Sequence, residues 1–207
     1  MIKGFENQKD LTDYLIDSRA LKSPEIIEVF ETVDRKDFVA PENVKYAYYD
    51  GALPIGYNQT ISQPTTVGIM FELLQPKKGQ KILDIGSGSG WTTAMLGYIV
   101  GREGSVIGLE LVPELVAFGQ QNLSKYDFPQ AQIQQAGDSL GLPGQLFDRI
   151  LVSAAANRIP AELVDQLKLG GRMVIPVENS IMLVKRDLTG SVNQKEIPGF
   201  VFVPLIS

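Results

Sequence analysis

The feature that most constrains the fold is the stretch Lys81–Gly90, in which a short apolar run leads into three glycines at alternate positions. The apolar run predicts a buried strand, and the glycines predict a tight loop that opens directly into a helix over Trp91–Val100. The free N–H groups and the positive dipole end of that helix favour a nucleotide-like ligand above the loop. We therefore expect a ligand site where this strand ends.

Strand-like and helix-like segments alternate along the central part of the chain. Strands are predicted over Lys81–Ile85, Ser105–Leu109, Ala131–Ala136, Phe147–Ser153 and Arg172–Val177, and helices over Thr65–Leu74, Trp91–Val100, Pro113–Tyr126 and Pro160–Leu167. Strands that alternate with helices at this spacing predict an α/β fold with a doubly wound, mostly parallel sheet.

The two ends of the chain depart from this alternation. Ile181–Arg186 and Phe200–Leu205 have no helix-length segment of good quality between them, so we expect an antiparallel pair that closes one edge of the sheet. Apolar residues at helical spacing over Lys9–Ala20, and Ser23 before a proline, predict a small N-terminal helical addition. A chain of 207 residues favours one domain, with parts at 1–64, 65–177 and 178–207.

The stretch Asp50–Pro64 is rich in glycine, proline and apolar residues but has little periodicity. Long irregular segments in compact domains are commonly lids or binding loops. Pro64 favours an extended conformation for Gln63, which would present Ser62 and Gln63 at the mouth of a site.

Composition limits the classes of partner. The net charge is −5, which argues against a broad surface for nucleic acid or membrane, because phosphate groups are bound by clustered Lys and Arg. The chain has no cysteine, and no uninterrupted apolar run approaches the length of a membrane span. We expect a soluble, cytoplasmic protein, a monomer, with no nucleic-acid and no membrane partner.

The chain also has no histidine. Catalytic triads and histidine-containing metal sites are therefore excluded, and we expect no bound metal. Any reaction at the glycine loop must need little proton transfer from the protein.

The residues around the glycine loop favour a cationic nucleoside over a dinucleotide. The glycine spacing lacks the third glycine of the dinucleotide fingerprint, and Trp91 stands at the position where that glycine would be needed. Asp84, just before the loop, would repel a pyrophosphate and attract an ammonium or sulfonium group. Glu110 lies twenty residues after Gly90, at the end of the second core strand, where a carboxylate can bind ribose hydroxyls.

These residues form part of a wider resemblance. Asp84–Gly90 resembles motif I of the class I methyltransferases. Further blocks, in the same order along the chain, resemble the protein-L-isoaspartate (D-aspartate) O-methyltransferase family: Leu53–Pro64, Gly137-Asp138, Phe147-Asp148, Ala154–Ala156, Leu167–Val177 and Phe202–Leu205. The similarity extends from about Arg35 to the last few residues, and its most specific block is the one that ends at Pro64.

The resemblance implies a Rossmann-like fold with a seven-stranded sheet, S-adenosyl-L-methionine as cofactor, S-adenosyl-L-homocysteine as product, and repair of isoaspartyl-containing proteins and peptides. The cofactor-binding residues that it implies are Gln59, Thr60, Ile61, Ser62, Asp84, Gly86, Ser87, Gly88, Glu110, Leu111, Asp138 and Ser139. On the substrate side it implies Ile55, Ser62, Gln63, Pro64, Ala154, Ala155 and Ala156, with Ser62 as the catalytic residue.

Carboxyl methylation suits a protein without histidine. A side-chain carboxyl group has a pKa of ~4 and is already ionised at neutral pH, so no base is needed to activate it. Ser62 would then orient the substrate by a hydrogen bond, since nothing is available to activate it as a nucleophile.

Two other functions stay open at this point. Thr65, Ser139 and Asn157 depart from the family pattern, so a class I methyltransferase acting on a carboxylate of another peptide or small acid is one alternative. A non-catalytic nucleotide-binding module is the other. Structural roles also compete: Ser62 could cap the helix that follows it, and Asp148 is expected to be structural.

Overall fold

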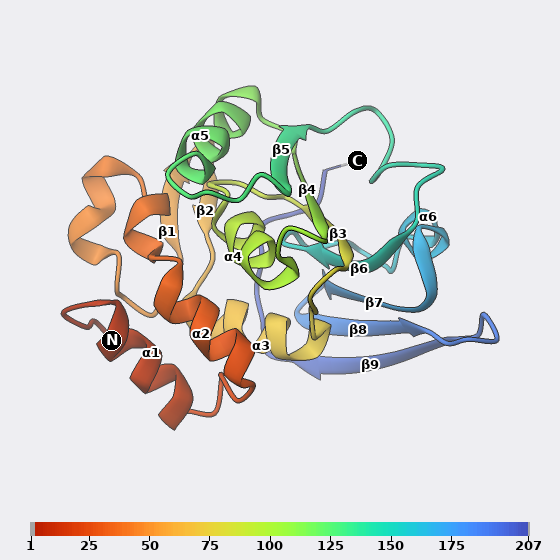
Figure 1. The fold of residues 1–207 in the computed structure, drawn as a ribbon, viewed down its shortest axis with the longest axis horizontal. Coiled ribbons are helices and arrows are strands. Elements are labelled where there is room, and N and C mark those ends of the chain that lie inside the picture. The colour runs from red at the N-terminus through yellow and green to blue at the C-terminus, as the bar shows by residue number, and fades with distance from the viewer. Residues whose placement is uncertain (1–2, 207) are drawn as a thin grey trace.

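The computed structural model describes residues 3–206, which form a seven-stranded sheet and a separate two-stranded hairpin (Figure 1). The strand order of the large sheet is β5-β4-β3-β6-β7-β8-β9, and its first five strands are parallel. They are β3 (Lys81–Ile85), β4 (Ser105–Glu110), β5 (Ala131–Gln135), β6 (Phe147–Val152) and β7 (Leu167–Val177). Antiparallel β8 (Ser180–Arg186) and β9 (Val192–Pro198) complete one edge, which confirms the predicted mostly parallel sheet with an antiparallel end.

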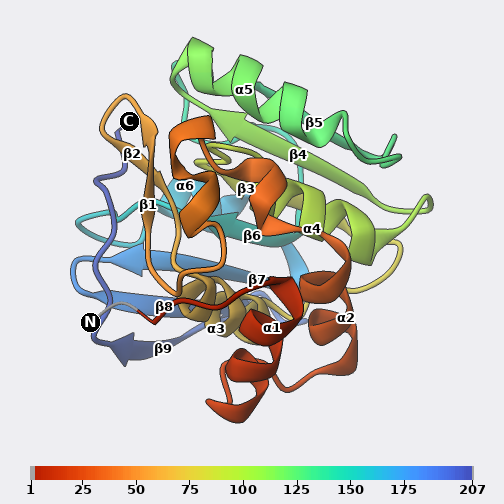
Figure 2. The same ribbon diagram turned by 90° about the vertical axis from the view of Figure 1, so that its left-hand side faces the viewer.

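Helices cover the two faces of the sheet unequally. One face is packed against α3 (Pro64–Leu74), α4 (Trp91–Val100) and α5 (Pro113–Leu123), and α1 (Gln8–Asp17) and α2 (Pro24–Thr32) form an outer layer against α3 and α4 (Figure 2). The other face carries the short helix α6 (Ala161–Asp165) and apolar side chains of the loop after β5. The sheet is thus covered on both faces, as predicted, but the second cover is thin.

The strand before the glycine loop is buried on both faces. Ile82 packs into the cluster beneath α3 and α4, whereas Leu83 packs into the cluster on the opposite face, and both are fully buried. A central parallel strand with helices or loops on each side takes this nearly continuous apolar composition. Among residues 3–206, no helix is both long enough and apolar enough to cross a membrane.

The prediction for the last strand was wrong. The partner of β8 is β9 at Val192–Pro198, whereas Phe200–Leu205 runs as an irregular segment with one isolated parallel bridge between Pro204 and Ala155. The turn before β9 is closed by the carboxylate of Asp187, which accepts hydrogen bonds from two backbone N–H groups. Because β9 is an edge strand with almost every residue exposed, it lacks the apolar alternation that marks a half-buried strand.

The stretch Asp50–Pro64 is more regular than its sequence predicts. It contains an antiparallel hairpin of β1 (Leu53–Gly56) and β2 (Gln59–Ile61). The turn residues Tyr57 and Asn58 have φ of 53° and 58°, the pair of positive values that a tight two-residue hairpin requires. The prediction of an irregular loop therefore missed a short hairpin with a bulge at Gly56.

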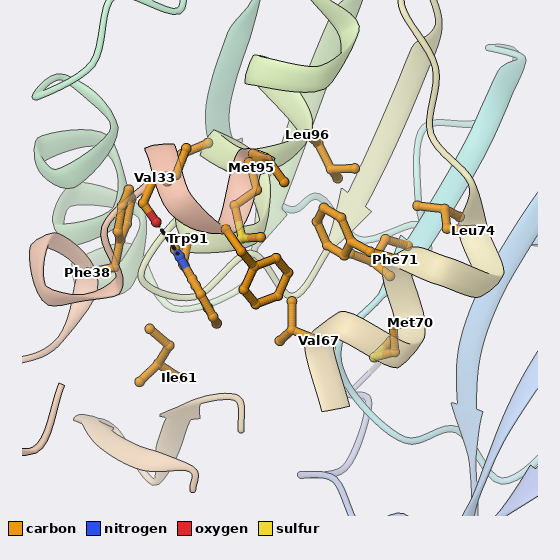
Figure 3. Close-up of a cluster of buried hydrophobic side chains, with 14 of the residues drawn as sticks. Val33, Phe38, Ile61, Val67, Met70, Phe71, Leu74, Trp91, Met95 and Leu96 are labelled. Carbon is orange, nitrogen blue, oxygen red and sulfur yellow. Dashed lines mark hydrogen bonds between the residues drawn. The ribbon is translucent and has the colours of Figure 1, made fainter. Parts of the chain in front are cut away.

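The N-terminal addition is held against α3 and α4 by hydrogen bonds. Ser23 is the N-cap residue of α2 and Pro24 its first residue, as predicted, but the Ser23 hydroxyl donates to Glu72 of α3 and accepts no N–H of its own helix. Two short 3-10 helices, η1 (Arg35–Phe38) and η2 (Pro41–Tyr46), follow α2. Figure 3 shows the Trp91 indole N–H donating to the Val33 carbonyl at the end of this layer.

Candidate cofactor and substrate site

A cavity of about 360 Å³ lies at the carboxyl ends of β3, β4, β5 and β6. The chain order reverses between β3 and β6, which are neighbours in the sheet although two strands separate them in sequence. Open parallel sheets bind ligands at this position, because the loops leaving the two neighbouring strands diverge and leave a crevice.

Six chain segments line the cavity. They are the hairpin and the residues after it, the glycine loop with the start of α4, the end of β4, the loop after β5, the end of β6 and the C-terminal segment: Ile55, Gln59–Ser62, Val67, Ile85–Ser89, Trp91, Thr92, Leu109–Val112, Ala136–Gly141, Ser153, Ala154 and Val203–Ile206. Most of the predicted cofactor-binding residues are therefore brought together in one cavity.

The glycine loop is compact because it packs directly against α5. Gly90 has φ of +88°, and a Cβ atom there would lie 2.9 Å from the Ile133 side chain and 3.0 Å from the Gly119 carbonyl oxygen. Only glycine accommodates both the positive φ and this close approach. Helix α4 begins at the next residue, so Trp91 replaces the glycine of the dinucleotide fingerprint without disturbing the loop.

Glu110 joins the end of β4 to the glycine loop. One carboxylate oxygen accepts the N–H of Gly88 at 2.9 Å, and the other accepts the N–H groups of Leu111 and Val112 at 2.8 and 3.0 Å. The side chain is 7% exposed and lines the cavity. The carboxylate is thus fixed in place by three main-chain N–H groups and forms part of the cavity wall.

Asp84 lies beneath the loop and not in the cavity wall. It is fully buried, and one carboxylate oxygen accepts hydrogen bonds from the hydroxyls of Thr92 and Thr93 at 2.8 and 2.6 Å, while the other has no partner among residues 3–206. Burial raises the pKa of Asp84 to about 6, the two threonine hydrogen bonds oppose the shift, and the nearby charge of Glu110 adds to it. An electron-rich oxygen without a donor is left close to the cavity.

The hairpin places Ser62 on the cavity wall with its hydroxyl free. The N-cap residue of α3 is Gln63, whose side chain makes no capping hydrogen bond, and the first-turn N–H of Thr65 donates to Asp50, so the alternative role of Ser62 as a helix cap is not observed. Its backbone carbonyl accepts a hydrogen bond from Arg35 at 3.1 Å. Ser62 is thus held through its main chain, and its side chain is available to a ligand.

Thr65, one of the departures from the family pattern, has a structural partner. Its N–H and hydroxyl both donate to the carboxylate of Asp50, at 2.9 and 2.8 Å, and Gln63 donates to the same carboxylate at 3.1 Å. Neither Thr65 nor the exposed Asn157 is among the cavity-lining residues. The side chain of Thr65 is therefore engaged within the protein, and of the three departures Ser139 alone lies in the cavity wall.

Four other predicted residues also lie outside the cavity wall. Gln63 is engaged with Asp50, and Pro64 is the first residue of α3. Ala155 exchanges backbone hydrogen bonds with the C-terminal segment, and Ala156 with the end of β7, so of the three alanines Ala154 alone faces the cavity.

Sequence reasoning missed two parts of the cavity wall. Val203–Ile206 form one side of the cavity because Ala155 bonds to Val203 and Leu205 on either side of Pro204. Phe202–Leu205 was one of the blocks that resemble the family. The segment is not the predicted strand, but part of it lines the cavity. Trp91 is 2% exposed and also forms part of the cavity wall, although sequence reasoning did not include it among the site residues.

The strand order, the cavity at the reversal and the acidic residue at the end of the second core strand define a Rossmann-like class I methyltransferase. Residues 6–207 match the profile of the family described as protein-L-isoaspartate(D-aspartate) O-methyltransferase. The chain belongs to that family.

Individual relatives agree with this assignment. The chain is 41% identical over 192 residues to a protein-L-isoaspartate O-methyltransferase of Methanopyrus kandleri, covering 90% of this chain and 85% of the relative. It is 38% identical over 196 residues to one of Methanococcoides burtonii, covering 91% and 97%. Among solved structures, the chain shares its fold with one from Plasmodium falciparum, described as a protein-L-isoaspartate O-methyltransferase in complex with S-adenosyl-L-homocysteine. The TM-score is 0.86 and the identity 24%, and the match covers 98% of this chain and 99% of that one.

Proposed function

We propose that the protein transfers the methyl group of S-adenosyl-L-methionine to the free carboxylate of L-isoaspartyl or D-aspartyl residues in damaged proteins and peptides. Membership of the family supports this activity. The observation that carries it is that the hairpin end with Ser62 shares one cavity with the glycine loop and Glu110. The substrate side and the cofactor side of the site thus meet.

The cavity residues fit this cofactor. Glu110 presents a fixed carboxylate suited to ribose hydroxyls, and Asp138 and Ser139 lie further along the wall, where the family resemblance expects the adenine. The buried carboxylate of Asp84 and the absence of Lys or Arg from the cavity wall favour a cationic group over a phosphate. Gln59, Thr60 and Ile61 would cover the methionine part.

The chain's own residues would act by orientation and exclusion of water. Bound S-adenosyl-L-methionine supplies an electrophilic methyl group, and a substrate carboxylate that is ionised at neutral pH accepts it without a base. Ile55, Ile61 and Trp91 give the wall an apolar surface, which favours a reaction in which opposite charges disappear. Ser62 would donate a hydrogen bond that orients the accepting carboxylate.

We also propose that the protein acts as a monomer in the cytoplasm, without nucleic-acid or membrane partners. The net charge of −5 supports the last two of these. The substrate partners are then isoaspartyl-containing proteins and peptides.

The substrate is tested with two peptides of one sequence, one containing isoaspartate and the other aspartate. With methyl-labelled S-adenosyl-L-methionine, we expect label on the isoaspartyl peptide alone, because the family to which the chain belongs is described by that substrate. Label on both peptides would favour a less selective carboxyl methyltransferase. Label on neither, with the cofactor still bound, would favour a nucleotide-binding module.

The role of Ser62 is tested by Ser62→Ala. We expect kcat to fall about tenfold, the value of one hydrogen bond made to a charged group, while the Kd for S-adenosyl-L-homocysteine stays nearly unchanged. The control is Ser124→Ala, since Ser124 is exposed and its hydroxyl donates to a carbonyl of its own helix. A parallel loss of kcat and cofactor affinity would assign Ser62 to the cofactor.

A further inference from the structure

Arg35 is a fully buried arginine that binds four backbone carbonyl oxygens. One terminal nitrogen donates to Ala47 at 2.7 Å and to Tyr49 at 2.9 Å. The other donates to Gly51 at 2.8 Å and to Ser62 at 3.1 Å. A single guanidinium group therefore joins both ends of the segment that contains the hairpin, and it touches the residue expected to orient the substrate.

The same guanidinium group lies over the ring of Trp91, with its central carbon 5.5 Å from the ring centroid. Trp91 is the first residue of α4, follows the glycine loop directly and lines the cavity. Its ring also meets Phe30 edge to face, at 5.6 Å between centroids, and Ile61 and Val67 belong to the same buried cluster (Figure 3). Arg35 thus contacts the substrate side and the cofactor side of the site at once.

This buried charge has no carboxylate partner within ion-pair distance in the described part of the chain. Burial lowers the pKa of Arg35 to about 9, and the more distant charge of Asp50 opposes the shift, so the group is still charged at neutral pH. An apolar side chain of similar volume would avoid the cost of burying a charge. The planar guanidinium group, however, fixes the positions of its hydrogen-bond partners, which an apolar side chain cannot do. The arrangement favours a role in positioning over one in stability alone.

We propose that Arg35 is a positioning residue for methyl transfer, which holds the Ser62 main chain at a fixed place relative to Trp91 and the glycine loop. Arg35 does not line the cavity, and it acts through these two neighbours. The proposal rests on the proposed function, since it concerns the alignment of the two halves of that site.

The test is Arg35→Lys, which keeps the charge but loses the planar fork and its stacking on the indole. We expect kcat on an isoaspartyl peptide to fall about tenfold, because a small misalignment of reacting groups is costly, while the Kd for S-adenosyl-L-homocysteine changes less than about threefold. In a Ser62→Ala background, Arg35→Lys should lower kcat little further, because both substitutions remove the same alignment of the Ser62 hydroxyl with the substrate.

Arg149→Lys is the matched control. Arg149 is also a buried arginine, 7% exposed, whose Nε donates to the Gln75 carbonyl and whose terminal nitrogen donates to the Asp148 carbonyl. It is not among the residues that line the cavity. We expect this variant to lose thermal stability as Arg35→Lys does, but to keep the kcat of the unchanged protein.

The only tryptophan of the chain is Trp91, so its fluorescence reports both folding and cofactor binding at this position. If Arg35→Lys is partly unfolded, the measurements are repeated in sucrose, which favours the compact state. A variant that stays unfolded, an equal loss of kcat in the two lysine variants, or additive effects with Ser62→Ala would each overturn the proposal. An inactive unchanged protein would instead contradict the proposed function.

Discussion

Replacement of Glu110 by alanine is expected to weaken binding of S-adenosyl-L-methionine by on the order of a hundredfold, the equivalent of one or two hydrogen bonds to a charged group. The carboxylate would bind the ribose and also accepts the N–H groups of Gly88, Leu111 and Val112. Its removal therefore leaves the ligand without an acceptor and three N–H groups without their partner. Calorimetric titration with S-adenosyl-L-homocysteine measures the loss.

The affinity of Glu110→Gln for the cofactor should lie between that of Glu110→Ala and that of the unchanged protein. The amide keeps one accepting oxygen but places donors where the other carboxylate oxygen accepts. The matched control is Glu114→Gln in the first turn of α5, an exposed side chain outside the cavity wall. That variant should bind the cofactor as the unchanged protein does. Full affinity in Glu110→Ala would show that the ribose is held elsewhere and would remove the proposed role of this residue.

The second large effect concerns the pH dependence of stability and the buried carboxyl of Asp84. Its pKa is raised to about 6 in the folded protein, above that of an unfolded aspartate, so the folded state binds the proton more strongly. The resulting stabilisation is complete below about pH 4 and is lost as the pH rises through about 6. Relative to Asp84→Asn, which does not titrate, the unliganded protein should lose on the order of 2 kcal/mol of unfolding free energy between pH 4 and pH 7.

Urea unfolding of both proteins at several pH values measures this difference. In the asparagine variant the amide group replaces the carboxylate oxygen that has no hydrogen-bond partner among residues 3–206, so the stability of this variant at any one pH is not the test. The change with pH is the test, because the constant cost cancels. Unfolding curves that shift in parallel for the two proteins would show that Asp84 keeps an ordinary pKa.

The buried sheet and the glycine loop were predictable because their residues report their surroundings. A strand covered on both faces must be nearly all apolar, and a loop with positive φ and close packing must use glycine, as Gly90 does. β9 was not predictable in this way. Almost every residue of this edge strand is exposed, and Ile197 alone packs against the core, so its sequence carries little of the apolar signal that burial imposes.

The site shows the same division. The residues with chemical groups in the cavity, such as Glu110 and Ser62, were predicted from their position and from the family resemblance. The positioning role proposed for Arg35 was not predicted, because the sequence does not distinguish a buried arginine from an exposed one. Its role depends on four carbonyl oxygens, and each main-chain carbonyl is the same whatever the residue that carries it.

The C-terminal segment has a practical consequence for handling the protein. Ala155 holds it through bonds to Val203 and Leu205, and Ile206 forms part of the cavity wall while being 66% exposed. An affinity tag added after this segment would begin at the edge of the site and compete with a peptide for the same space. A tag at the other terminus avoids this, since Gly4 pairs with Tyr49, outside the residues that line the cavity.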